Sequence, residues 1–238
     1  GAGNVTVIVD ETADLAAAAK KIAASKTFDN STSCSSENAL VIVDAIYDDF
    51  VAAMAAEGGA TLDASMEQHV LDRLWQKGHL ARGALAQDAD KLLEVLELTD
   101  QVSAGTKFVA VPTEGIGPEH KLSGEKLSLV VALYRARDYD HAQELAMRVL
   151  DHQGAGHSVG IHTDDDSRAM GLGLKAPTCR VIVNQAHCFA NGGSFDNGLP
   201  FSLSMGCGSW GGNSIDENLH WKHFLNITKV VRPIPARE

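Results

Sequence analysis

The chain has 238 residues and a net charge of −11, and 45% of its residues are hydrophobic. This length suffices for one large domain or two small ones with a sizeable core. The acidic charge and the lack of a Lys/Arg cluster exclude a nucleic-acid partner, and no apolar window reaches the roughly 18 residues of a membrane span. We therefore expect a cytoplasmic protein that binds neither nucleic acid nor a membrane.

Short β-branched runs alternate with helical patterns along the chain. Strands are predicted at 5–9, 39–43, 107–111, 127–136, 157–163 and 179–184. Helical segments are predicted at 13–26, 47–57, 63–77, 87–98, 139–152 and near 165–174. Strands that are apolar on both faces and separated by helices are typical of a mostly parallel sheet covered on both sides. The predicted fold class is α/β.

The last quarter of the chain has a different composition. Residues 190–198 and 206–214 are rich in glycine, which permits tight turns and a close backbone approach to a ligand. Residues of about 221–235 follow as an extended strand that ends at prolines. Because no later strand is there to pair with it, we expect this strand to pair with another subunit and to form a homo-oligomer.

Four cysteines, Cys34, Cys179, Cys188 and Cys207, occur without a C-x-x-C pair. This spacing suggests neither a zinc site nor a dithiol motif, so we expect reduced thiols and no metal. Cys34 is unusual because it lies in the polar loop TFDNSTSCSSENA. Nearby hydroxyl, amide and backbone N–H donors would lower the pKa of a thiol and stabilise an oxyanion. These residues by themselves leave a nucleophile and a structural thiol both open.

The segments KTFDNSTSCSSENALVIVD, GEKLS, GAGHS and GCGSWGGNSIDENLHWKHFLN resemble the catalytic region of the CoA-acylating branch of the aldehyde dehydrogenase superfamily. The resemblance spans nearly the whole chain. It implies an aldehyde dehydrogenase catalytic domain over 1–238, including the C-terminal oligomerisation strand. It also implies that the cofactor-binding domain lies before Gly1, outside this chain, and that this chain alone has no significant dehydrogenase turnover.

The resemblance assigns roles to three residues. Cys34 would attack the aldehyde, form a thiohemiacetal and then a thioester, and release the acyl group to coenzyme A. Glu125, in GEKLS, would accept hydrogen bonds from the nicotinamide ribose hydroxyls of NAD or NADP. His157, in GAGHS, would exchange a proton with the thiol of coenzyme A or with the departing thiol.

Residues 178–201 resemble the sulfoacetaldehyde dehydrogenase group, followed by the succinate semialdehyde group. Acetaldehyde and propionaldehyde are the alternative substrates. An anionic aldehyde requires a cation or several hydrogen-bond donors. Arg180 and His187, with the backbone N–H groups of Gly192 and Gly193, are the candidates, although Arg180 is also expected as a surface cation.

Three other functions remain open from the sequence. A hydrolytic aldehyde dehydrogenase would use the same cysteine but release the acyl group to water instead of coenzyme A. An oligomerisation module would leave Cys34 without a chemical role. A thiol hydrolase would pair Cys34 with His157 and an acidic residue that orients the imidazole.

Overall fold

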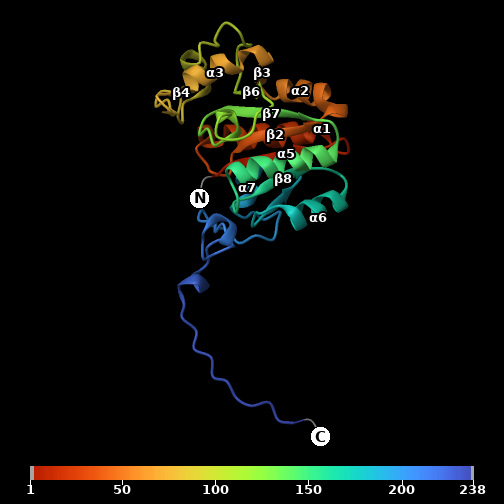
Figure 1. Ribbon diagram of the computed structural model, residues 1–238, viewed down its shortest axis with the longest axis vertical. Helices are drawn as coiled ribbons and strands as arrows, with labels where there is room; N and C mark the ends of the chain where they lie inside the picture. The colour runs from red at the N-terminus through yellow and green to blue at the C-terminus, as the bar shows by residue number, and fades with distance from the viewer. Residues whose placement is uncertain (1–2, 237–238) are drawn as a thin grey trace.

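The structure, a computed structural model, describes residues 3–236. Its core is a seven-stranded sheet with the order β3-β6-β7-β2-β1-β8-β9, in which every neighbouring pair is parallel (Figure 1). The strands are β1 Val5–Val9, β2 Glu37–Val43, β3 Gly59–Thr61, β6 Phe108–Pro112, β7 Val130–Ala136, β8 Val159–His162 and β9 Val181–Val183. The predicted α/β class with a parallel sheet is confirmed.

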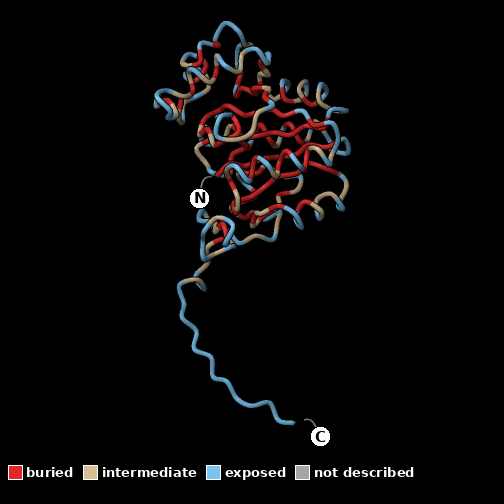
Figure 2. Tube along the Cα trace, in the orientation of Figure 1, coloured by how far each residue is buried: buried red, intermediate tan, exposed pale blue. Residues whose placement is uncertain are grey.

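Helices cover both faces of this sheet. They are α1 Leu15–Thr27, α2 Tyr47–Ala56, α3 Glu67–Leu74, α4 Ala89–Val95, α5 Tyr139–His152, α6 Asp166–Lys175 and α7 His187–Asn191. Helix α1 connects β1 to β2, and α6 connects β8 to β9. Because β1 and β8 are neighbours, these two connections run toward opposite edges of the sheet. Because such crossovers are right-handed, α1 and α6 lie on opposite faces. The central strands are therefore buried on both sides, and β2 is buried at every residue (Figure 2).

Two features of the region between β2 and β6 differ from the sequence prediction. The helical segment predicted at 63–77 ends at Leu74, because the chain folds back in a hairpin of β4 Trp75–Gln76 and β5 His79–Leu80. The short strand β3 was not predicted. Its first residue, Gly59, has no room for a side chain, since a Cβ there would lie 2.5 Å from Cζ of Phe108.

The C-terminal segment is not a strand of this sheet. Trp221–Phe224 forms a 3₁₀ turn where a strand was predicted. Residues 225–236 form no helix or strand and are exposed throughout, and they extend away from the sheet (Figures 1 and 2). Several of their apolar side chains are almost fully exposed, including Val231 at 87% and Ile234 at 93%. A partner for this segment is therefore not found among residues 3–236.

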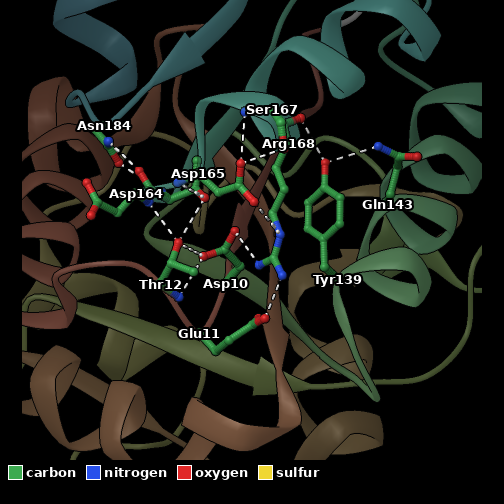
Figure 3. A network of polar contacts seen from close by, with 11 residues as sticks. Asp10, Glu11, Thr12, Tyr139, Gln143, Asp164, Asp165, Ser167, Arg168 and Asn184 are labelled. Carbon is green, nitrogen blue, oxygen red and sulfur yellow. Dashed lines mark hydrogen bonds and ion pairs between the residues drawn. The ribbon is translucent and has the colours of Figure 1, made fainter.

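A polar network joins the carboxyl ends of β1 and β8 (Figure 3). Asp10 is fully buried and lies 2.9 Å from Nη1 of Arg168, which also contacts Glu11 at 2.6 Å. Thr12 donates its hydroxyl to Asp10 at 2.6 Å and lies 3.0 Å from the hydroxyl of Thr163. The buried carboxylate is thus paired and hydrogen-bonded, as burial of a charge requires.

No helix in the described part of the chain has the length and apolar character needed to cross a membrane.

Candidate active site

The predicted catalytic residues come together at the amino ends of the central strands. Cys34 precedes β2, Glu125 precedes β7 and His157 precedes β8. Because these strands are parallel and lie within the run β7-β2-β1-β8, their amino ends lie at the same edge of the sheet. Gly3, which leads into β1, lies against the same loop: a Cβ on it would be 2.4 Å from the carbonyl oxygen of Cys34.

The loop before Cys34 is held in an unusual conformation. Asp29, Asn30 and Ser31 have φ values of 49°, 50° and 63°, a region that costs energy for residues other than glycine. The buried ammonium of Lys26 anchors this turn by donating to the hydroxyl of Ser31 and to the carbonyl of Glu37, both at 2.8 Å. The chain therefore holds Cys34 at a fixed place beside β2.

The Cys34 residue is exposed, so a substrate can reach its thiol. Partial burial of the sulfur and the negative charge of Glu125 raise the pKa of Cys34, and a hydrogen bond with Ser35 opposes them only in part. One of the loop hydroxyls bonds within the loop and not to the thiol, since Ser36 contacts Ser31 at 2.5 Å.

His157 contacts Cys34 and is the candidate catalytic partner of this thiol. Its Nε2 lies 3.2 Å from the sulfur, and the side chain is 4% exposed. Burial and the nearby charge of Arg180 lower the pKa of His157 to about 4. The imidazole is therefore neutral at pH 7. Its other nitrogen, Nδ1, contacts the hydroxyl of Ser158 at 2.7 Å, and the acidic orienting residue of the thiol hydrolase alternative is not at this position.

Glu125 lies within electrostatic reach of Cys34, whose pKa it raises. Its loop is fixed by two long-range hydrogen bonds: the N–H of Glu125 donates to Gln153 at 2.7 Å, and the N–H of Lys126 donates to Asn38 at 2.9 Å. Burial raises the pKa of the Glu125 carboxyl. The side chain is only partly buried, so its carboxylate fits the role of an acceptor for the hydroxyl groups of a ribose.

Arg180 is buried, with 6% exposure, so the alternative expectation that it is a surface cation is wrong. Three of its N–H groups donate to the side chain of Asn218 at 3.0 Å and to the carbonyls of His157 and Gly206 at 3.1 and 3.0 Å. The guanidinium therefore clamps the backbone of His157 to the glycine-rich segment 206–214. Its charge also interacts with Cys34, so it contributes a positive potential at the thiol.

The other predicted anion-binding groups do not face solvent. His187 is 1% exposed, and its Nε2 contacts the hydroxyl of Ser158 at 2.8 Å. The N–H of Gly193 donates to the carbonyl of Ala190 at 3.0 Å, and Gly193 is buried. Gly192 is partly buried and follows α7 directly. The structure therefore gives His187 and Gly193 contacts within the protein instead of the open positions that an anion pocket requires.

Two residues at the site were not singled out by the sequence analysis. Ser158 joins His157 to His187, and Cys207 interacts electrostatically with Cys34. Both lie in the quoted motifs GAGHS and GCGSWGGNS. These motifs pack together at Gly156, where a Cβ would be 2.2 Å from the carbonyl oxygen of Cys207. The motifs signal this packing, but only the fold shows which side chains meet.

Replacing Glu125 with Gln is expected to make Cys34 more reactive toward iodoacetamide in this chain. Removing the negative charge favours the thiolate, so the midpoint of the pH–rate profile should fall by up to about one pH unit. The matched control is Glu119→Gln, an exposed glutamate in the same β6–β7 connection, which should leave the profile unchanged. An unchanged or higher midpoint in the Glu125 variant would show that this carboxylate does not act on the sulfur.

Within residues 3–236, no group of three or more His, Cys, Asp or Glu side chains is placed to hold a metal ion.

Comparison with known proteins shows what the chain is similar to. The sequence model of the aldehyde dehydrogenase family matches residues 1–73, which include Cys34. The acetylating aldehyde dehydrogenase of Geobacillus thermoglucosidasius superposes on the whole chain with a TM-score of 0.90 and 30% identity, over 52% of its own length. The chain is therefore similar to aldehyde dehydrogenases in sequence and in fold.

Among aldehyde dehydrogenases, the chain is similar to acylating enzymes. The acylating sulfoacetaldehyde dehydrogenase of Cupriavidus necator is 49% identical over 98% of this chain and 48% of its own length. The bifunctional aldehyde-alcohol dehydrogenase of Escherichia coli is 36% identical over 98% of this chain and 26% of its own length. The chain thus spans about half the length of the sulfoacetaldehyde dehydrogenases that it matches.

Proposed function

We propose that the chain is the cysteine-bearing catalytic part of an enzyme that oxidises an aldehyde to an acyl-CoA. The observation that carries the proposal is the contact of 3.2 Å between Nε2 of the buried His157 and the sulfur of the exposed Cys34. The similarity to acylating sulfoacetaldehyde dehydrogenases supports it.

Cys34 supplies the nucleophile. Its thiol loses its proton to solvent, and the sulfur bonds to the aldehyde carbon, so the carbonyl oxygen takes the negative charge of the thiohemiacetal. Loss of a hydride from that carbon restores the C=O bond and leaves an acyl thioester on Cys34. When NAD or NADP is bound, its nicotinamide accepts this hydride. The carboxylate of Glu125 would hold the nicotinamide ribose by accepting its hydroxyl hydrogens, beside the amino end of β7.

Coenzyme A completes the reaction. Its sulfur attacks the thioester carbon, the bond to Cys34 breaks, and the Cys34 sulfur leaves with the electron pair. His157 lies against this leaving sulfur and exchanges a hydrogen bond with it. A hydrolytic enzyme would use water in this step, and the acylating relatives favour coenzyme A as the acceptor.

Sulfoacetaldehyde is the proposed aldehyde. Its sulfonate would be attracted by the charge of Arg180, which interacts with Cys34 from a buried position. Three relatives of the chain, at 49%, 37% and 38% identity, carry the name sulfoacetaldehyde dehydrogenase. Succinate semialdehyde, acetaldehyde and propionaldehyde are the alternatives.

The exposed C-terminal segment supports a homo-oligomer. The apolar side chains of Ile227, Val230, Val231 and Ile234 are 74–93% exposed, so burying them against another copy of the chain would be favourable. Such pairing would give residues 225–236 the strand partner that they lack within the described part of this chain.

The experiment that tests this function measures turnover by the full-length enzyme with sulfoacetaldehyde, succinate semialdehyde and acetaldehyde, each with and without coenzyme A. We expect an acyl-CoA product only with coenzyme A, and the highest kcat/KM with sulfoacetaldehyde. Release of the free acid without coenzyme A would instead identify a hydrolytic enzyme. Equal rates with the three aldehydes would remove the case for an anion-binding site.

A further inference from the structure

An unbroken chain of hydrogen bonds runs from Cys34 into the core. The Cys34 sulfur lies 3.2 Å from Nε2 of His157, Nδ1 of His157 lies 2.7 Å from Oγ of Ser158, and this Oγ lies 2.8 Å from Nε2 of His187. Ser158 is fully buried, and the two histidines are 4% and 1% exposed. The function proposed above uses His157 but not the two residues behind it.

The hydroxyl of Ser158 links the protonation states of the two rings. It has one proton and lies between two ring nitrogens, so it donates to one ring and accepts from the other. If it donates to His187, His157 carries its proton on Nδ1 and faces Cys34 with a lone pair. If it donates to His157, His187 carries its proton on Nε2 and His157 faces Cys34 with an N–H. A neutral pair of histidines has only these two arrangements.

The surroundings of Nδ1 of His187 decide which of the two arrangements forms. Its Nδ1 is buried and has no hydrogen-bond partner among residues 3–236. Gly160 lies close to it: a Cβ on Gly160 would lie 3.0 Å from this nitrogen and 2.8 Å from Val7. A buried N–H without an acceptor is rarer and more costly than an unused lone pair. The proton of His187 therefore belongs on Nε2, where it has Ser158 as acceptor.

We propose that His187, acting through Ser158, holds His157 in the tautomer whose Nε2 carries the proton, so that His157 donates a hydrogen bond to the sulfur of Cys34. Ser158 and His187 are positioning residues. The role rests on the proposed function, in which the Cys34 sulfur bears negative charge when it attacks the aldehyde and when coenzyme A displaces it. A donor at that place stabilises the sulfur in both events without giving up its proton.

Burial and nearby charges keep the rings of His157 and His187 neutral. Burial and the neighbouring His157, His162 and Arg180 lower the pKa of His187 to about 3. Burial and Arg180 do the same for His157. Glu125 and Cys207 act on the sulfur itself and raise its pKa. The tautomer, and not the charge, is therefore the property that Ser158 and His187 control near pH 7.

Nuclear magnetic resonance of the ¹⁵N-labelled chain tests the tautomer directly. Long-range ¹H–¹⁵N spectra near pH 7.5, with His157 assigned from His157→Gln, should show His157 and His187 protonated on Nε2. A His157 ring protonated on Nδ1 would overturn the proposal. This measurement needs no substituted site residue other than the one used for assignment, so it remains decisive even where a variant fails to fold.

The second arm is the pH profile of Cys34 alkylation by iodoacetamide. Ser158→Ala removes the donor to Nδ1 of His157, so the midpoint should rise by roughly one pH unit. Ser158→Thr keeps the hydroxyl and should match the wild type. An unchanged midpoint in a Ser158→Ala variant as stable as Ser158→Thr would overturn the proposal. Neither arm uses aldehyde or coenzyme A, so failure of the proposed function would appear separately, as absent acyl-CoA formation with the tautomer intact.

Discussion

Replacing Cys34 with Ala in the full-length enzyme is expected to lower kcat/KM for CoA-dependent aldehyde oxidation by roughly 10⁴-fold or more, the scale seen when a covalent nucleophile is removed. The physical reason is that Ala cannot form the thiohemiacetal or the thioester. Because the Cys34 residue is exposed, its replacement removes little packing. The stability of the variant should therefore stay close to that of the wild type.

The matched control is Cys179→Ser. Cys179 is also a free thiol. It lies near the glycine-rich segment 206–214, since a Cβ on Gly208 would lie 3.1 Å from its sulfur. Among the described residues, no hydrogen bond joins its side chain to His157, so steady-state kinetics of this variant should differ little from those of the wild type. Retained turnover after loss of the Cys34 thiol would refute the covalent mechanism.

Replacing Arg168 with Met is expected to lower the free energy of unfolding by about 3–5 kcal/mol, the usual effect of leaving one partner of a buried ion pair uncompensated. Asp10 is fully buried and pairs with Arg168 at 2.9 Å. Burial alone would raise the pKa of Asp10, but hydrogen bonds from Thr12, Thr163 and Arg168 outweigh it and lower the pKa. Urea unfolding of the two proteins measures the difference.

Arg135→Met is the control for this experiment. Arg135 also lies over a tyrosine ring, at 4.5 Å from Tyr47 compared with 4.7 Å between Arg168 and Tyr139. It also pairs with an aspartate, Asp44, but that partner is 55% exposed. Such surface pairs contribute only about 0–1 kcal/mol. Equal losses in the two variants would contradict a special role for burial.

The pH dependence adds an independent check on Asp10. A carboxyl with a lowered pKa in the folded state stabilises the protein above its unfolded pKa of about 3.9, and this stabilisation is lost as the pH falls through the folded value. The cost of Arg168→Met should therefore be greatest near pH 7 and shrink below about pH 4. A cost that stays constant down to pH 3 would point to lost packing instead of lost charge pairing.

Local patterns in the sequence predicted the larger elements well. Helix α5 has the predicted bounds of 139–152, because its apolar face is regular and Asp138 caps its first turn by accepting from the N–H of His141. The strand β3 was missed because three residues are too few to show a period. The hairpin after Leu74 was missed because its turn depends on Lys77 and Gly78, both at positive φ.

The sequence motifs named the candidate site residues but could not show their electrostatics. The fold brings Cys34, Glu125 and His157 to one edge of the sheet, and their catalytic roles stay predictions. The raised pKa of Cys34 depends on Glu125, a residue distant in the sequence, and on burial, so the loop sequence could not reveal it. His187 was expected in a substrate pocket because it lies in the segment that resembles sulfoacetaldehyde dehydrogenases and an anionic aldehyde needs donors. Its ring is buried instead and lies against Ser158 and Gly160 at β8.

Mass spectrometry of the acyl-enzyme tests most directly whether Cys34 carries the acyl group. The full-length enzyme is incubated with sulfoacetyl-CoA or acetyl-CoA without reduced nicotinamide cofactor, so that the Cys34 sulfur displaces coenzyme A and the thioester accumulates. We predict the added acyl mass on the peptide that contains Cys34, and its absence in Cys34→Ala. An acyl group on another residue, or no adduct with either thioester, would contradict the account.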